Sequence, residues 1–252
     1  MSRRTLSSVH NAARLLKSFS GVEREQGVTE LARRLDLGKS TVHRLLATLE
    51  AEQLVEQNPE TGRYRLGLAV MELGGAASSP SDLHNAVLIP MSLLRVRTGE
   101  TVQASVLDGR QVVYVERLES PNTLRLFLEV GRRNHAHSTG SGKLLLAYLS
   151  PEELEVVLAG WDMPRLTDWT ITDPQELRRD LRQVRAQGHA CNRHESEVGV
   201  VSVAAPIRDS ARRVIAALSV AGPADRLDPN IDRLVRDVVE AAAMASRRLA
   251  ES

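Results

Sequence analysis

The chain has 252 residues, of which 42% are apolar and 26% charged, and its formal net charge is only +1. No stretch approaches the roughly 20 apolar residues that a membrane-spanning helix needs, and the first residues, MSRRTLSS, lack the apolar core of a signal peptide. The single cysteine, Cys191, excludes an internal disulfide framework and is typical of a reducing compartment. The sequence therefore predicts a soluble, cytoplasmic protein of one or two domains with no membrane partner.

The small net charge hides an asymmetry between the two parts of the chain. Residues 1–67 carry 11 Lys and Arg against 8 Asp and Glu, a balance of +3, whereas the remaining 185 residues have a balance of −2. A positive excess in the N-terminal part favours contact with phosphate groups, but it is too small to assign that function by itself.

The stretch from Thr29 to Gln53 holds two helical patterns separated by Leu37 and Gly38. In the second pattern apolar residues recur at i, i+3, i+4 and i+7, which predicts one buried stripe: Val42, Leu45, Leu46 and Leu49. The opposite face has short polar groups, one forked cation and no bulky apolar side chain: it carries Ser40, Arg44, Ala47 and Thr48, with Thr41 and His43 on its flanks. Such a face fits a DNA major groove, although a small helical domain that binds no DNA would show the same apolar stripe.

Two short extended runs follow, Leu54 to Gln57 and Arg63 to Leu66, and the turn between them is rich in Asn, Pro and Gly. Helix, short turn, helix and hairpin is the order of a winged helix-turn-helix, which favours DNA binding. Upstream, Ser7 and Ser8 are predicted to cap a first helix that ends at Ser20-Gly21, and Thr29 is predicted to cap the second helix.

Four further arginines are candidates for the DNA-binding surface. Arg63 and Arg65 share one face of the second wing strand, where they are predicted to reach phosphates or the minor groove. Tyr64 and Leu66, on the other face, are predicted to pack inward. Arg33 and Arg34 of the second helix are either phosphate contacts or part of a solvated charged face.

The run GVTELARRLDLGKSTVHRLLATLEAEQLVEQNPETGRYRLGL resembles the N-terminal domain of the IclR family of bacterial transcription regulators, and later stretches resemble the same family over nearly the whole chain. In the family's usual pattern a proline precedes the Lys-Ser-Thr that begins the recognition helix, where this sequence has Gly38. The departure loosens the helix start without removing a contact. The resemblance implies a ligand-responsive DNA-binding regulator and not an enzyme.

The segment from Leu68 to Ala77 is apolar and helical, and Ser78, Ser79, Pro80 and Ser81 end it. This pattern predicts a domain boundary, and together with the resemblance it implies three parts: a winged helix-turn-helix domain at 1–67, a linker helix and boundary at 68–81, and an effector-binding and oligomerisation domain at 82–252. The resemblance implies that the linker helix takes part in dimer contacts. Asp82 to Arg97 is predicted to form another helix with a kink at Pro90.

The second domain begins with extended runs, Thr101 to Leu107, Gln111 to Leu118 and Thr123 to Val130, the first two joined by an Asp108-Gly109 hairpin turn. Helices with proline at their first position follow, capped by Ser150 and Asp173, and then two strands and a last helix that opens at Asp228-Pro229. The order predicts an α+β fold with helices on one side of a sheet, and it resembles the GAF-like effector domain of the same family.

Three stretches are candidates for a ligand site. A loop rich in glycine and hydroxyl groups, Ser138 to Gly142, opens a helix whose free N–H groups favour an anion, although helix capping alone also explains it. The strands VGVVSVAAPI and VIAALSVAGP each have one bulky side and one side of small or hydroxylated residues. That second side predicts either room for a small molecule or close cover by a helix.

The resemblance favours the small molecule. Transferred onto matching positions, the family's effector site comprises Leu126, Gly140, Ser141, Asn192, Val200, Ser202, Ser219 and Ala221. Asn192 stands where the family often has an acid, so the hydrogen-bonding pattern of the ligand is expected to differ.

Other chemistries have less support in the sequence. His189, Cys191, His194 and Glu195 are metal-ligand types within seven residues, but no second cluster completes a known zinc spacing, so they are predicted to be polar groups at the rim of the site. Ser141 near Lys143, or Cys191 near His194, resembles a nucleophile and base, yet the chain has no GxSxG, HExxH or dinucleotide motif. No cofactor and no catalysis are predicted.

The sequence thus predicts a homo-oligomeric regulator, a dimer or a dimer of dimers, that binds a palindromic DNA operator and responds to a small organic or aromatic carboxylate. The alternative is a DNA-binding regulator whose second domain only oligomerises, or, less favoured, binds a metal.

Overall fold

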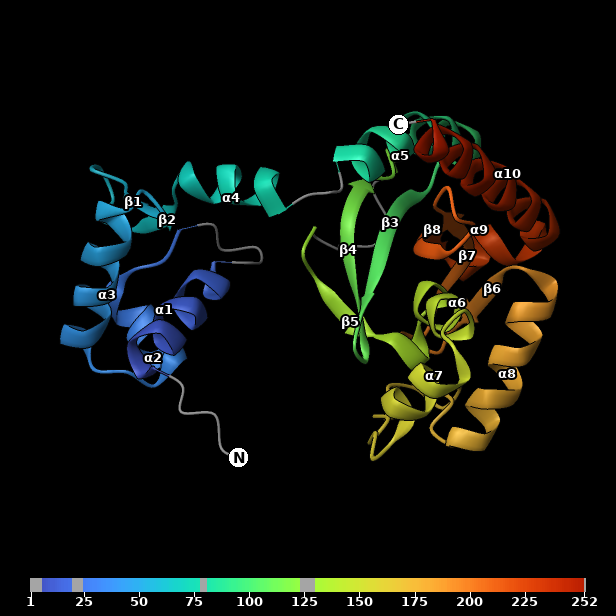
Figure 1. Cartoon of the computed structure of the whole chain (residues 1–252), viewed down its shortest axis with the longest axis horizontal. Helices are drawn as coiled ribbons and strands as arrows, with labels where there is room; N and C mark the ends of the chain where they lie inside the picture. The colour runs from blue at the N-terminus through green and yellow to red at the C-terminus, as the bar shows by residue number, and fades with distance from the viewer. Residues whose placement is uncertain (1–5, 20–24, 78–80, 123–129, 252) are drawn as a thin grey trace. The chain divides into compact units, whose positions relative to one another are not determined.

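The computed structural model describes residues 6–19, 25–77, 81–122 and 130–251 (Figure 1). Its contacts divide the chain into two compact units, Met1–Ser81 and Asp82–Ser252. Within the described ranges, no helix is both long and apolar enough to cross a membrane.

The first unit is a winged helix-turn-helix, as the order of patterns predicted. It contains α1 (Ser7–Ser18), α2 (Val28–Leu35), α3 (Lys39–Ala51), β1 (Val55–Gln57), β2 (Tyr64–Leu66) and α4 (Ala69–Ala77) (Figure 1). The expected stripe of α3 is buried, since Val42 and Leu46 have no exposed surface and Leu49 is only 6% exposed. These side chains pack with residues of α1, α2 and the wing in one core.

Two predicted helix caps are wrong. Thr29 lies inside α2, which begins at Val28 because the Gly27 N–H donates to Glu30 Oε2 at 3.1 Å and so satisfies a free donor at the helix start. Ser7 and Ser8 are helical residues of α1, whose N-cap is Leu6 and makes no side-chain cap bond. The predicted end at Ser20-Gly21 lies outside the described residues.

The wing is a two-stranded antiparallel sheet extended by one bridge. Gln57 pairs with Tyr64, and Gln26 exchanges two backbone hydrogen bonds of 2.9 Å with Tyr64. Tyr64 is buried as expected, but Leu66 is 38% exposed, so the prediction that it packs inward is wrong. The strand ends at Leu66, where no further core layer covers its side chain.

The second unit opens with α5 (Ser81–Thr98), one helix that includes Pro90. Six strands then form an antiparallel sheet in the order β5-β4-β3-β8-β7-β6. They are β3 (Thr101–Asp108), β4 (Gln111–Leu118), β5 (Arg133–His135), β6 (Ala190–Arg193), β7 (Val200–Arg208) and β8 (Val214–Pro223). The Asp108-Gly109 hairpin forms as expected, whereas the expected strand Thr123 to Val130 lies, except for Val130, outside the described residues.

The helices of this unit are η1 (Ala136–Ser138), α6 (Gly140–Ala147), α7 (Pro151–Leu158), α8 (Pro174–Gln187), α9 (Ala224–Leu227), η2 (Asp228–Asn230) and α10 (Ile231–Ala250). The predicted starts of α7 and α8 are confirmed, because Ser150 and Asp173 each accept a hydrogen bond from the N–H three residues later. Gly188 ends α8 with a left-handed φ of 76°.

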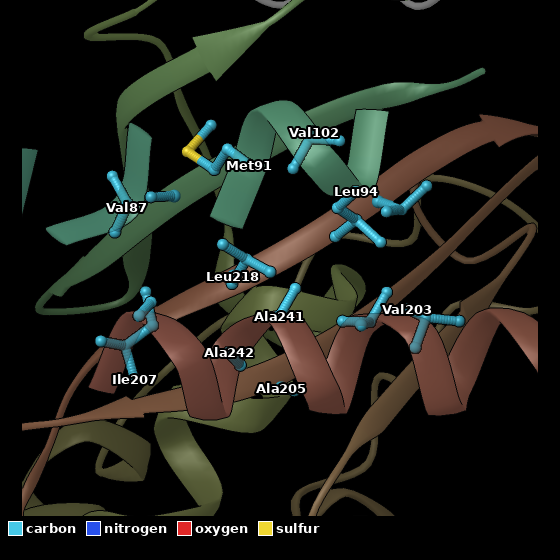
Figure 2. Packing of buried hydrophobic residues seen from close by; sticks show 14 of the residues in the cluster. Val87, Met91, Leu94, Val102, Val203, Ala205, Ile207, Leu218, Ala241 and Ala242 are labelled. Atoms are coloured by element: carbon cyan, nitrogen blue, oxygen red, sulfur yellow. The ribbon is translucent and has the colours of Figure 1, made fainter. Parts of the chain in front are cut away.

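Helices cover both faces of the sheet, so the prediction of one covered side is wrong. One face packs on α5 and α10, with Val87, Met91, Leu218 and Ala241 in a common core (Figure 2). The other face packs on α6, α7 and α8. Because each strand alternates its side chains between two apolar layers, nearly every position of β7 and β8 is buried.

Candidate functional site

The outer face of α3 presents the polar side chains expected to read DNA. Ser40, Thr41, His43 and Arg44 are all exposed, on the side opposite the buried stripe. The Thr48 hydroxyl donates to the Arg44 carbonyl within the helix, so it is turned toward its own backbone. Among the described residues the Arg44 guanidinium has no partner, which leaves its fork free for a base or phosphate.

Basic side chains flank this face. Arg33 and Arg34 are exposed on α2, and Arg34 also donates to Gln26 Oε1 at 3.4 Å. Lys39, the first residue of α3, is exposed as well and had not been singled out from the sequence. Its position at the helix start, just before Ser40 and Thr41, is the signal that could have identified it.

The wing arginines are held by carboxylates within the same unit. Arg63 Nη2 lies 2.7 Å from Glu30 Oε2 and 3.0 Å from the Glu25 carbonyl oxygen. Arg65 Nε lies 2.5 Å from Glu56 Oε1. Hydrogen bonds from Asn58 and Thr61, together with the two arginines, lower the pKa of Glu25 against a smaller opposing effect of burial. A phosphate would therefore compete with these carboxylates for the arginines or use the guanidinium N–H groups that they leave free.

The second unit contains a cavity of about 210 Å³ on the α6 side of the sheet. This volume is below the roughly 300–1,000 Å³ of sites for drug-sized molecules, so the cavity suits a small metabolite. Its described lining comes from all six strands of the sheet, η1, the start of α6 and the loops beside them: Gln103, Tyr114, Arg132, Asn134, His135, Ser138, Thr139, Ser141, Leu166, Asn192, Ser196, Glu197, Val200, Ser202, Ser219 and Ala221.

Sheet register explains why residues far apart in sequence meet here. Asn192 pairs with Ser202 and Ser202 with Ala221, which makes one row across β6, β7 and β8. In the next row Ser219 pairs with Gln103 of β3. Directly opposed residues of neighbouring strands lie on the same face, so the two rows form the floor of the cavity.

The start of α6 forms another wall of the cavity. The Thr139 hydroxyl accepts from the Gly142 N–H at 3.1 Å, so helix capping occupies one of the donors that was expected to favour an anion. A Cβ at Gly142 would lie 2.2 Å from the Ala136 carbonyl oxygen, and a Cβ at Gly140 would lie 3.0 Å from Ser202 Oγ. Glycine at position 140 lets α6 approach β7 closely, and glycine at position 142 lets it pack against the backbone of η1.

Six of the eight residues expected at the effector site line this cavity, namely Ser141, Asn192, Val200, Ser202, Ser219 and Ala221. Gly140 lies against Ser202 without lining the cavity, and Leu126 is outside the described residues. The strand sides with small residues were predicted to leave room for a small molecule or to be covered closely by a helix. Each interpretation applies to a different part of the sheet. The helix α6 covers Ala204 and Ala217, while the cavity opens at the other end of the same face.

Several lining residues were missed by the sequence analysis, above all Gln103 and Tyr114. Their signal is the parity of β3, where Val102 and Ala104 face the α5 core while Thr101, Gln103 and Ser105 place polar groups on the opposite side of a central strand. A polar side on a buried strand indicates a site or a polar network.

A buried ion pair links α6 to the loop after β6. Lys143 Nζ lies 2.7 Å from Glu195 Oε1 and 3.3 Å from Asp180 Oδ2. The side chains of Lys143 and Glu195 are only 3% and 10% exposed. Burial raises the pKa of Glu195, and the neighbouring Lys143 opposes that rise.

The same loop is anchored through its backbone. Thr170 Oγ1 donates to the Glu195 carbonyl oxygen at 2.7 Å, and Thr167 Oγ1 donates to that of His194 at 2.8 Å. The Asn192 side chain accepts from the Glu195 N–H at 2.9 Å and donates to Ser196 Oγ at 2.9 Å. The wall formed by Asn192, Ser196 and Glu197 is therefore held from several sides.

The four metal-ligand types near β6 each have another contact, and the first of them, His189, has its Nδ1 3.2 Å from the Gln187 carbonyl oxygen. The Cys191 side chain packs on the α10 side of the sheet, and burial raises the pKa of its thiol. His194 accepts from the Gly199 N–H and stacks against Trp169, while Glu195 pairs with Lys143. Within the part of the chain that is described, no three His, Cys, Asp or Glu side chains are grouped to hold a metal ion.

A winged helix-turn-helix with a polar recognition helix, followed by an α+β unit with a polar cavity, defines a DNA-binding transcription regulator with a ligand-binding domain. The chain belongs to the IclR family: residues 8–59 match the IclR helix-turn-helix domain, and residues 76–247 match the C-terminal domain of bacterial transcriptional regulator IclR. It is thus a DNA-binding transcription regulator with a C-terminal effector-binding domain.

Known proteins resemble the chain over most of its length. It is 35% identical to the HTH-type transcriptional regulator XynR of Escherichia coli (strain K12) over 243 residues, 96% of each chain. It is 38% identical to KdgR of the same organism over 219 residues, 87% of this chain and 83% of KdgR. The structure of an IclR homolog complexed with 4-hydroxybenzoate from Microbacterium hydrocarbonoxydans matches with a TM-score of 0.88 at 30% identity, over 97% of this chain and all of that one.

Proposed function

We propose that this regulator binds a palindromic operator as a homo-oligomer, and that a small organic carboxylate in the cavity of the second unit changes its operator affinity. The observation that carries the proposal is the cavity itself, which has the size of a small metabolite and a lining rich in hydrogen-bonding groups. The related structure that holds 4-hydroxybenzoate supports a carboxylate, and Arg132 and His135 in the lining suit its charge.

In this proposal Ser40, Thr41, His43 and Arg44 read base edges in the major groove. Arg33, Arg34, Arg63 and Arg65 contact phosphates and position the unit without reading sequence. Pairing of two copies would present two such helices to the two halves of a palindrome. Met71 and Leu73 of α4 are 74% and 59% exposed, and such apolar side chains suit contacts between copies.

Regulation requires that the ligand bind one arrangement of the copies more tightly than another, because equal affinity for both would shift no equilibrium. Residues 68–81, which join the two units, are the element proposed to change. In this scheme Ser141, Asn192, Val200, Ser202, Ser219 and Ala221 contact the ligand, and the missing side chain at Gly140 leaves room for Ser202; Leu126 is carried over from the family resemblance alone.

Thermal-shift measurements on the full chain test this function. A panel of small carboxylic acids that includes 4-hydroxybenzoate should contain a compound that raises Tm, since ligand at 100 times its Kd stabilises the folded state by about 2.7 kcal/mol. Ser202→Leu should abolish the shift, whereas Ser210→Leu on the exposed turn after β7 should preserve it. A panel that never changes Tm or operator affinity would favour a second domain that only oligomerises.

A further inference from the structure

A second cavity lies on the opposite side of the sheet, between residues 239–250 of α10 and residues 205–212 at the end of β7 and in the turn after it. We call it the α10 groove. Its volume of about 480 Å³ is within the roughly 300–1,000 Å³ of sites for drug-sized molecules. Among the described residues, it shares no lining residue with the first cavity, so the two spaces are separate.

One end of the α10 groove has an apolar floor. Ala205 of β7 and Ala242 of α10 belong to the buried core between the sheet and this helix (Figure 2). Beside them Val239 is 40% exposed, and Ala243 is exposed as well. Residues 239–250 span about 16 Å at the rise of an α-helix, so this floor suits an elongated apolar chain better than one compact ring.

The other end of the groove carries cations. Ser246 of α10 accepts from the Arg208 N–H at 2.9 Å, and Arg208 Nη1 donates to the Arg212 carbonyl oxygen at 3.1 Å. Arg212 and Arg247 are both exposed here, and in the described chain neither guanidinium has a hydrogen bond or an ion pair. Asp209, the one acid of the described lining, is already paired with an arginine 2.8 Å away. This end is therefore positively charged.

We propose that the α10 groove is a second ligand site, and that its ligand is an unbranched, medium-chain fatty carboxylate such as decanoate. The chain lies on the apolar floor, and the carboxylate accepts hydrogen bonds from Arg212 and Arg247. A compact polar acid would leave the floor in water, and an uncharged lipid would leave the two cations without an anion. The inference goes beyond the proposed function, which concerns only the first cavity.

Calorimetric titration of the full chain with hexanoate, octanoate, decanoate and decanol tests both features of the ligand. Affinity should rise about two- to fourfold with each added methylene, because each one removes more apolar surface from water. Decanol has the same chain without the charge and should bind at least about 5-fold more weakly than decanoate. No binding, an affinity independent of chain length, or equal binding of decanol would refute the proposal.

Four surface variants locate the site. Ala243→Trp fills the floor and should weaken decanoate by about 10-fold or more, whereas Ala186→Trp, at an exposed alanine of α8 outside the lining, should have no effect. Arg247→Ala should weaken decanoate about 5-fold and leave decanol unchanged. Its control is Arg236→Ala, at an exposed arginine of the same helix that does not line the groove. Equal effects of a variant and its control would refute the assignment.

Two further measurements exclude other occupants. Ser202→Leu, which changes only the first cavity, should keep the full affinity for decanoate; loss of binding there but not in Ala243→Trp would place the fatty acid in the first cavity and overturn the proposal. Light scattering should give Ala243→Trp the particle mass of wild type. A smaller mass would assign the groove to a contact between copies and likewise overturn the proposal. Neither result bears on the operator or on the ligand of the first cavity.

Discussion

Replacing Lys143 by Met tests the energetic role of the buried ion pair beside the cavity. The change leaves the Glu195 carboxylate, whose side chain is 10% exposed, without the ammonium group 2.7 Å away. Removing one partner of a buried pair costs about 3–5 kcal/mol, because the remaining charge stays out of water. Asp180 is 29% exposed and keeps some hydration, so Glu195 accounts for most of the loss.

The pH dependence gives this prediction a second signature. Burial already raises the pKa of Glu195, and loss of Lys143 raises it further. The folded variant then binds a proton more readily than the unfolded chain does, so its stability increases as the pH falls through the folded-state pKa toward the lower pKa of the unfolded chain. The destabilisation relative to wild type should therefore shrink between pH 8 and pH 5.5, by at most about 1.4 kcal/mol per pH unit.

Urea denaturation followed by tryptophan fluorescence measures the unfolding of the second unit, since both tryptophans, Trp161 and Trp169, lie there. The control is the double variant Lys143→Met/Glu195→Met, which buries no charge at either position and should recover most of the stability at every pH. A single variant within about 1 kcal/mol of wild type at pH 8, or a loss that does not change with pH, would refute this reasoning.

Five further variants, two of them comparisons, test other parts of the structure. Arg44→Ala should cost about 1–3 kcal/mol on the cognate operator and relax preference at one base pair in a competition assay, whereas Arg65→Ala should weaken all sequences alike and flatten the salt dependence. An equal loss on every sequence would assign Arg44 to phosphate. Gly142→Ala should lower the free energy of unfolding by about 3 kcal/mol, because its Cβ would meet a carbonyl oxygen at 2.2 Å; a neutral effect in urea denaturation would contradict the close approach of α6. Burial lowers the pKa of His137, so wild-type stability should fall as the pH drops below about 6.5, when only the unfolded chain gains the proton. His137→Phe should flatten that dependence in a Tm series and His189→Gln should not; a dependence unchanged by His137→Phe would place the titration elsewhere.

Local signals in the sequence predicted the elements that local interactions determine. The starts of α7 and α8 follow from Ser150 and Asp173, whose side chains bond the backbone three residues on. The buried stripe of α3 follows from helical spacing alone. At the start of α2 the hydrogen bond between Gly27 and Glu30 takes the place of a hydroxyl cap. The prediction that Thr29 caps this helix is therefore wrong.

Long-range pairing was not accessible in the same way. Gln103 and Ser219 are more than one hundred positions apart, and only the register of β3 on β8 brings them together. The three-residue strand β5 and the four-residue strand β6 are too short for a periodic pattern, so the lining residues of β5 were missed and Asn192 of β6 was expected only from the family resemblance. The helices α5 and α10 cover the second face of the sheet because they pack together against it. The pattern of either helix alone does not predict that packing. The positions expected at the effector site came from the family resemblance and not from spacing.

In the proposed regulation, ligand in the cavity of the second unit controls operator occupancy by the first. Fluorescence anisotropy of a labelled operator fragment, titrated with wild type and with Ser202→Leu, measures this directly with and without saturating ligand. We expect the ligand to change the wild-type operator Kd by about 5-fold or more, and to leave the operator Kd of Ser202→Leu unchanged at the ligand-free wild-type value. A wild-type operator Kd that ligand does not alter, or a Ser202→Leu variant that responds fully, would contradict the account.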